Sequence, residues 1–298
     1  MRSAFLSALI LSLCACGDPD PERLSHTGID QAGVRAYAPA HELWSDGATK
    51  RRLLWLPEAA AIDTSDPDNW VFPGGTKAWK EFSRDGVVVE TRLLEKTGAG
   101  SWRGLAFVWD GDDAFSRPGG ERDANGTPHD VPDQEACFQC HPDGESALLG
   151  VSAIQLAHDQ GDTTLASLEA EGLLSDPIAA PVIPGDDITR DALGYLHANC
   201  GNCHNDDLND NPLRLRLLVD RLTTPEDTPT YQTAVGVATE ADPIPGIAAT
   251  VVVEAGSPDD SALYLRMSLR GEGAMPFVGS EDVDPAGTAA IAAWIESL

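Results

Sequence analysis

The sequence predicts an α+β protein in which a β-rich, sandwich-like N-terminal domain precedes a small all-α domain. The first observation is that residues 32–115 hold short apolar segments separated by Asp-Gly turn signals. The second is that residues 187–298 hold segments that start at helix-capping residues and carry apolar side chains at helical spacing. A chain of 298 residues is long enough for one or two hydrophobic cores.

The N-terminal part contains three segments with the pattern of β-strands. Residues 50–56 form a short apolar and basic run. Residues 81–94 flank Asp85-Gly86, a two-residue turn signal, and are predicted to form a hairpin. Residues 101–109 alternate between apolar and polar side chains and end at a second Asp-Gly pair. We expect this β-rich domain to span residues 31–160.

The segment that follows these strands is not expected to form a long helix. Residues 117–135 are rich in Pro, Gly and Asp, which end helices or favour turns. A short helix is expected around residues 146–158. Residues 161–186 are then expected to be a linker.

The C-terminal part, residues 187–298, is predicted to hold three helices. Asp187 can cap a helix over residues 188–199. Ser257 followed by Pro258 has the cap and first-turn residues of a second helix. Asp284 followed by Pro285 starts a third helix in the same way, and this helix runs to the C-terminus.

The N-terminus has the features of an export signal. Arg2 precedes about ten apolar or small residues, a run too short to span a membrane as a helix. The Leu-Cys-Ala-Cys segment at residues 13–16 resembles the bacterial lipobox, in which a small residue precedes the lipidated cysteine. We expect residues 1–15 to be a signal peptide, Cys16 to carry lipid and residues 16–30 to form an acidic tether. Secretion without lipid is the alternative.

Two short motifs indicate a cofactor. Residues 137–141 and 200–204 both read Cys-x-x-Cys-His, the attachment pattern of c-type haem. Two thiols three positions apart can bond the two vinyl groups of one porphyrin, and the following histidine can bind the iron. The predicted thioether residues are Cys137, Cys140, Cys200 and Cys203, and the predicted iron ligands are His141 and His204. The motifs therefore predict two covalently attached haem c groups.

Other uses of the same cysteines stay open. Four cysteines can bind one structural zinc ion, although about 60 residues separate the two pairs and zinc needs no histidine after each pair. A thioredoxin-like dithiol needs a surrounding βαβ pattern, which the sequence does not show. Disulfides are a third possibility in an exported chain.

The order of features in residues 187–298 is helix, CxxCH motif, loop, helix, Met275-Pro276 and terminal helix. This order resembles the class I cytochromes c. The resemblance implies that Met275 is the second axial ligand of the second haem iron. It also implies that the carbonyl group of Pro212 accepts a hydrogen bond from the proximal imidazole. Met267 lies within an apolar helical pattern and is expected in the core.

A series of further motifs runs through the chain in order. They are residues 43–48 (Leu-Trp-Ser-Asp-Gly-Ala) with Lys50, residues 70–76 (Trp-Val-Phe-Pro-Gly-Gly-Thr), residues 80–82 (Lys-Glu-Phe), residues 90–94 (Glu-Thr-Arg-Leu-Leu), the first CxxCH motif, Leu149-Gly150 and Gln155-Leu156. This series is similar to a family of uncharacterised bacterial two-haem c-type cytochromes. The resemblance implies haem binding and electron transfer, and it implies no particular reaction.

The first haem is expected on a loop that leaves the β-rich domain, because no helix of useful length precedes its motif. His158 is the candidate for the distal ligand of this iron, since it is the nearest histidine on the helical side. The other histidines outside the motifs are His26, His41, His129 and His197.

Together these expectations describe a lipid-anchored two-haem cytochrome that transfers electrons outside the cytoplasm. It would lie on the periplasmic face of the inner or outer membrane, or at the cell surface. A two-haem redox enzyme, either a peroxidase or a small-molecule dehydrogenase with an open iron position, is the first alternative. The second is a module that binds a partner or a glycan, because six of the seven tryptophans lie between positions 44 and 109. We expect these tryptophans to fill a core instead.

The charge of the chain limits its partners. There are 20 Lys+Arg against 48 Asp+Glu, which gives a net charge of −28. Such a chain repels phosphate backbones, so a nucleic-acid partner is not expected. A redox partner protein should present a basic docking face, and contact with a membrane is expected only through the N-terminal lipid.

Overall fold

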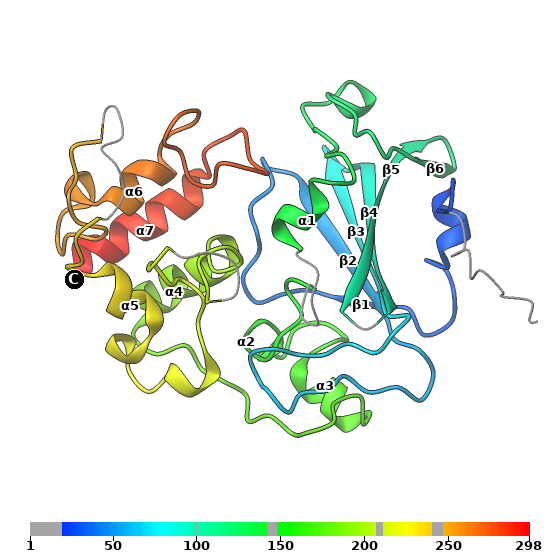
Figure 1. Ribbon diagram of the computed structural model, residues 1–298, viewed down its shortest axis with the longest axis horizontal. Coiled ribbons are helices and arrows are strands. Elements are labelled where there is room, and N and C mark those ends of the chain that lie inside the picture. Colours follow the sequence, from blue (N-terminus) through cyan, green and yellow to red (C-terminus); the bar gives the residue numbers. More distant parts are fainter. Residues whose placement is uncertain (1–19, 99, 142–147, 207–210, 240–246) are drawn as a thin grey trace, which may run out of the picture.

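The computed structural model describes residues 20–98, 100–141, 148–206, 211–239 and 247–298. It shows one antiparallel sheet together with helices that come mainly from the second half of the chain (Figure 1). This confirms the α+β class. The predicted signal peptide and the lipidation residue Cys16 lie outside the described residues. Within the described part of the chain, no helix is long and apolar enough to cross a membrane.

The six strands of the sheet follow one another in chain order, and each pairs antiparallel with the next. They are β1 (Arg35–Tyr37), β2 (Thr49–Trp55), β3 (Lys77–Arg84), β4 (Val87–Gly98), β5 (Ser101–Asp110) and β6 (Asp113–Ser116). All the predicted strands are confirmed. Asp85 and Gly86 form the β3–β4 turn with φ values of 50° and 80°.

Irregular segments and short helices cover the sheet, and the described residues form no second sheet opposite it. The predicted sandwich is therefore wrong for this part of the chain. On one face, Leu53, Trp79 and Leu93 pack with Leu24 and Ile29. Leu24 begins η1 (Leu24–Thr27), so the end of the predicted tether lies on the sheet, because its apolar side chains are buried there.

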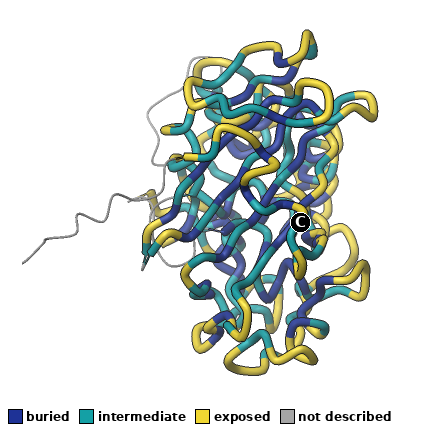
Figure 2. Tube along the Cα trace, turned by 90° about the vertical axis from the view of Figure 1, so that its right-hand side faces the viewer, coloured by how far each residue is buried: buried dark blue, intermediate teal, exposed yellow. Residues whose placement is uncertain are grey.

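The opposite face has an apolar end covered by two short helices. Leu54, Ala78 and Leu94 pack there beneath α2 (Ala153–Leu156) and α3 (Leu165–Ala170). Helix α3 belongs to the segment expected as a linker, but its Leu165 and Leu168 are buried in this core. Trp70, Trp79 and Trp102 are also buried, as a tryptophan-rich core requires. The tube in Figure 2 shows buried residues inside and exposed residues on the outer loops.

Between the sheet and the C-terminal helices, the chain forms only η2 (Ala124–Gly126) and α1 (Cys137–Cys140) before residue 142. The prediction that residues 117–135 form no long helix is confirmed. The later elements are α4 (Asp187–Asn199), η3 (Val219–Arg221), η4 (Pro225–Asp227), α5 (Pro229–Ala234), η5 (Pro258–Asp260), α6 (Ala262–Met267) and α7 (Pro285–Ser297). Ala192 and Leu196 of α4 share a core with Trp294 of α7.

Two helix starts differ from the sequence prediction. The cap of α4 is Asp186, one residue earlier than expected, and its carboxylate accepts a hydrogen bond from the Thr189 N–H at 2.9 Å. The second predicted helix is divided into η5 and α6, because Ser261 between them has extended backbone angles. The predicted cap of the last helix is confirmed, since Asp284 accepts hydrogen bonds from two N–H groups of the first turn at 3.0 Å.

Candidate functional site

Helix α4 delivers the second CxxCH motif. Cys200 is its C-cap, and the N–H groups of Cys203 and His204 donate to the Cys200 carbonyl at 3.0 and 2.8 Å. Gly201 allows this tight turn, because a Cβ atom there would lie 2.7 Å from the His197 carbonyl oxygen. The turn brings His204 to the cavity that Cys200 also lines.

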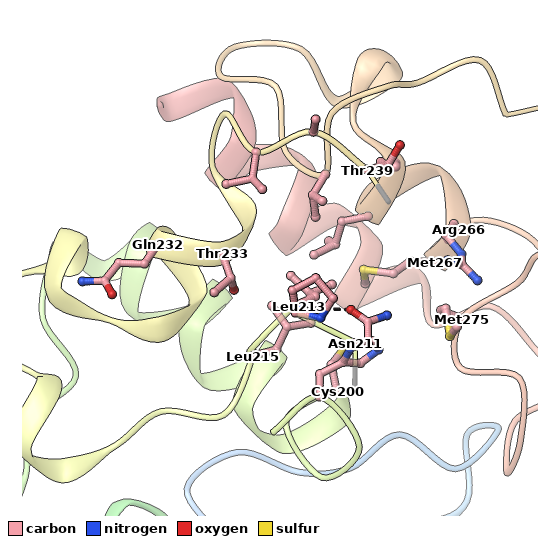
Figure 3. A pocket seen from close by; sticks show the side chains of 17 residues that line it. Cys200, Asn211, Leu213, Leu215, Gln232, Thr233, Thr239, Arg266, Met267 and Met275 are labelled. Atoms are coloured by element: carbon pink, nitrogen blue, oxygen red, sulfur yellow. Dashed lines mark hydrogen bonds between the residues drawn. The ribbon is translucent and has the colours of Figure 1, made fainter. Parts of the chain in front are cut away.

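A cavity of about 520 Å³ lies beside this turn. Its walls include the motif residues Cys200 and His204 together with both methionines of the described chain, Met267 and Met275. Figure 3 shows the two methionines on the same side of the cavity. Much of the remaining wall is apolar, with Leu213, Leu215, Val237, Val252, Ala262 and Leu263. The cavity thus combines a thiol, an imidazole and two thioethers in apolar surroundings.

The two methionines are held differently. Met267 is 7% exposed and is part of the core between α4, α6 and α7. Met275 is half-buried, and its N–H donates to the Arg266 carbonyl at 2.9 Å. The Nε atom of Arg266 in turn donates to the Gly273 carbonyl at 3.0 Å. Helix α6 therefore holds the segment that presents Met275 to the cavity.

His204 has a buried nitrogen that needs a partner. Its Nδ1 atom makes no hydrogen bond within the described residues. Burial lowers the pKa of His204, and the backbone of Leu213 acts in the opposite direction. The backbone of Leu213, one residue after Pro212, therefore lies near this imidazole, and both residues line the cavity.

The first CxxCH motif forms α1 and rests on the sheet. A Cβ atom on Gly104 of β5 would lie 3.0 Å from the Cβ and 3.1 Å from the Sγ of Cys137. A larger residue at this position would require Cys137 to shift by a few tenths of an ångström, so glycine favours the close approach of α1. Phe138 packs against the core at the covered end of the sheet. His141 follows the helix, and its N–H donates to the Cys137 carbonyl at 3.0 Å.

The four motif cysteines are half-buried. Burial raises the pKa of each thiol, and for Cys200 it raises the pKa to about 12. For Cys203 the second cause, after burial, is the charge of Cys140 in the other motif. Cys140 and Cys203 therefore lie close enough to interact electrostatically. Reactive dithiols need a lowered pKa, which these cysteines do not have. Among the described residues, no three His, Cys, Asp or Glu side chains converge as a metal site.

The loop of residues 42–47 bonds two segments of the C-terminal half, the end of α4 and residues 280–282. Asn199, at the end of α4, accepts the Trp44 N–H at 2.7 Å and donates to the Glu42 carbonyl at 3.0 Å. Asp46 Oδ1 accepts hydrogen bonds from Ser280 Oγ and from the N–H groups of Glu281 and Asp282 at 3.0, 3.0 and 2.9 Å. We call this loop the clasp.

Three of the other histidines use ring nitrogens in hydrogen bonds. His158 donates from Nε2 to the Ala38 carbonyl at 2.8 Å and accepts the Gln160 N–H at Nδ1, at 3.2 Å. Iron binding by His158 would require one of these bonds to break. His129 bonds Glu90 at 2.7 Å, and His197 accepts the Leu217 N–H at 3.1 Å. The structure thus provides no ready support for His158 as a distal ligand.

Sequence reasoning missed the residues that join the two motifs to the rest of the chain. Asp46, Lys50, Lys80 and Arg92 belong to the motifs that carry the family resemblance, and Arg52 belongs to a predicted strand, but their roles depend on contacts between distant segments. The alternation of cations along predicted strands was a usable signal for a charged sheet face. No protein family, curated protein or solved structure matches the chain.

Proposed function

We propose that the protein is a two-haem c-type cytochrome that transfers electrons outside the cytoplasm. The observation that carries the proposal is the cavity in which Cys200, His204 and Met275 come together. Its volume of about 520 Å³ and its apolar walls suit a cofactor. The buried Nδ1 of His204 fits a proximal ligand, whose second nitrogen commonly donates to a nearby carbonyl group.

The residues of each motif have separate roles in this proposal. Cys200 and Cys203 hold one haem, with His204 and Met275 as the axial ligands of its iron. Cys137, Cys140 and His141 hold the other. Bound haem supplies one-electron redox chemistry, and a His/Met pair raises its reduction potential. Residues 187–298 would serve as the small all-α, class I-like cytochrome domain.

The alternative chemistries have less support. A redox-active dithiol is disfavoured by the raised pKa of the thiols. A glycan-binding tryptophan surface has less support because Trp70, Trp79 and Trp102 are buried, which leaves only Trp44, Trp55 and Trp109 partly exposed. A peroxidase or small-molecule dehydrogenase would need an open iron position, and the first site is the candidate for one, since His158 is engaged elsewhere.

Export and anchorage complete the proposal. Cys16 would carry the lipid, which would hold the protein at the periplasmic face of a membrane or at the cell surface. The acidic chain would dock a redox partner through a basic face on that partner.

A pyridine haemochrome assay on protein purified from cells that attach c-type haem tests the proposal. We expect two covalent haems per chain, one in the Cys137→Ala/Cys140→Ala variant and one in the Cys200→Ala/Cys203→Ala variant. Mass spectrometry of the two motif peptides identifies the haem that each variant loses. Wild-type protein without covalent haem would refute the proposal. Rapid reaction of the two-haem protein with peroxide or carbon monoxide would favour the enzyme instead.

A further inference from the structure

The sheet face beneath α1 carries a row of cations that the CxxCH motifs do not explain. Arg52, Lys80 and Arg92 lie directly opposite one another on β2, β3 and β4. Lys50 lies two residues before Arg52 and therefore on the same face. Like charges on directly opposite residues destabilise a sheet. We call these four residues the cation row, and such a row requires anions close to it.

One end of the cation row is neutralised by a single carboxylate. Glu42 lies 3.2 Å from Arg52 and 3.9 Å from Lys50. Asp284 also acts on Lys50 from the C-terminal half of the chain. However, the Oδ1 atom of Asp284 accepts the first N–H groups of α7, so this carboxylate mainly serves the helix.

The other end is only partly neutralised. Glu90 has no exposed surface and bonds the Nε atom of Arg92 at 2.6 Å. Lys80 has no hydrogen-bond or ion-pair partner among the described residues. Burial, followed by the charges of Arg52, Arg92 and Lys50, lowers the pKa of Lys80 to about 7. Glu42 and Glu90 are thus two carboxylates for four basic side chains, and Lys80 has neither of them as a partner.

The cation row lies next to the first attachment motif. The charge of Arg92 acts on the thiols of both Cys137 and Cys140, and that of Lys80 acts on Cys140. The small residues Gly104 and Ala106 of β5 continue the face on the side where α1 rests. From β5 to β2 the face extends over three strand spacings of about 4.8 Å each, which is the length scale of a porphyrin.

We propose that the cation row binds the two propionate carboxylates of the first haem. This inference rests on the proposed haem attachment at Cys137 and Cys140. Two propionates would bring the carboxylates beside the cation row from two to four, one for each basic side chain, and an anion beside Lys80 would favour its charged form. Charge-assisted hydrogen bonds to Lys and Arg are about twice as strong as neutral ones. The chain has a net charge of −28, which would repel the propionates. The cation row supplies positive charge beside the motif, where these carboxylates would bind.

The test compares Lys80→Met with Lys77→Met. Lys77 lies on the same strand but on the opposite face of the sheet, so this control removes the same charge without touching the cation row. A redox titration resolves two midpoint potentials, and the second haem is identified by its shift in Met275→Leu. We expect Lys80→Met to lower the potential of the first haem and to shift its propionate bending band in the resonance Raman spectrum. Lys77→Met should leave that band unchanged.

The outcomes separate this inference from the function on which it rests. Wild-type protein without haem on the first motif peptide contradicts the proposed function itself. The propionate site is overturned if Lys80→Met carries two haems and its first haem has the same potential and the same propionate bending band as in Lys77→Met. A changed axial ligand in Lys80→Met also overturns it, because that result would assign Lys80 to the iron. If Lys80→Met does not fold, Arg52→Met repeats the test, and Lys80→Arg should retain the wild-type band.

Discussion

At the scale of single residues, the two methionines that line the cavity differ in how deeply they are buried. Met267 is buried within the core of α4, α6 and α7, whereas Met275 is half-buried on a segment held by Arg266. Met267 stabilises the fold through its packing in the core. The sulfur atom of Met275 is less buried and could bind a metal without loss of that packing.

We predict that Met275→Leu abolishes the charge-transfer absorption band of a methionine–iron bond and lowers the potential of the second haem. The reason is the loss of the thioether ligand, which favours reduced iron. Absorption spectra of the oxidised protein measure the change. Met267→Leu is the control, since this swap nearly conserves volume and should cost less than about 1.5 kcal/mol. Loss of the band in Met267→Leu alone would reverse the assignment.

Glu90 is the second case at this scale. It is fully buried and bonds both Arg92, at 2.6 Å, and His129, at 2.7 Å. Burial raises the pKa of Glu90, but the Arg92 charge and the hydrogen bonds from His129 and Arg92 outweigh it, so its pKa lies below the usual value. The ionised carboxylate therefore stabilises the folded state above its usual pKa.

We predict that Glu90→Gln lowers the free energy of unfolding by about 1–3 kcal/mol at neutral pH, because Arg92, whose side chain is 34% exposed, loses its buried carboxylate. The difference from wild type should shrink as the pH falls through the lowered pKa, where the wild-type carboxylate is protonated. Urea unfolding at neutral and acidic pH measures both effects. Glu121→Gln is the control, since the Glu121–Arg117 pair is partly exposed and should contribute less than about 1 kcal/mol. An equal loss at all pH values would contradict the electrostatic account.

At the scale of elements, α1 is too short to be stable by itself and depends on the sheet. It rests where Gly104 leaves space on β5, and Phe138 packs against the core. The strands and most helix ends were predictable because turns and caps are local. The approach of α1 to β5 was not predictable, since it joins residues 104 and 137.

We predict that Gly104→Val reduces haem attachment from two haems per chain towards one. A Cβ atom at this position would already lie 3.0 Å from the Cβ atom of Cys137, so the two methyl groups of valine should displace α1 from the sheet. The haemochrome assay and the mass of the first motif peptide measure the loss. Gly98→Val on β4 is the control, because a Cβ atom there would meet nothing within 4 Å. Full haem loading of Gly104→Val would show that α1 can shift without consequence.

At the scale of the whole molecule, the clasp connects the sheet with two segments that lead to the cavity. Asn199 directly precedes the cavity residue Cys200, and residues 280–282 follow the cavity residue Met275 in the chain. The sheet is thereby linked to the position of both proposed ligands of the second haem. Arg216 adds a further contact between the halves, since it donates to Asn69 Oδ1 at 2.9 Å.

We predict that Asp46→Ala weakens the methionine–iron band and accelerates carbon monoxide binding at the second haem. The variant loses three hydrogen bonds that hold residues 280–282. Stopped-flow mixing with carbon monoxide measures the effect. Asp85→Ala is the control, because Asp85 has nearly the same φ as Asp46, 50° against 49°, but lies in an exposed turn. If both variants weaken the methionine–iron band and accelerate carbon monoxide binding equally, the change comes from the positive φ angle and not from the lost hydrogen bonds.

We also predict that electron transfer with a basic c-type cytochrome, used as a probe partner, slows as salt is added. The net charge of −28 attracts a basic partner, and salt screens this attraction. The second-order rate constant as a function of ionic strength is the measurement. An acidic flavodoxin as donor is the control and should show the opposite slope. Identical slopes for both probes would show that docking does not use the overall charge.

The sequence by itself determined the strands, the Asp-Gly turns, the last helix cap and the two attachment motifs, because each depends on residues that are close in the chain. Tertiary structure alone decided which methionine is buried, that Leu213 lies beside His204, and that Asp46 holds a segment more than 230 residues later. It also assembled the cation row, in which each strand contributes one or two charges. The physical reason is that contacts between distant segments depend on strand register and packing, which no local pattern encodes.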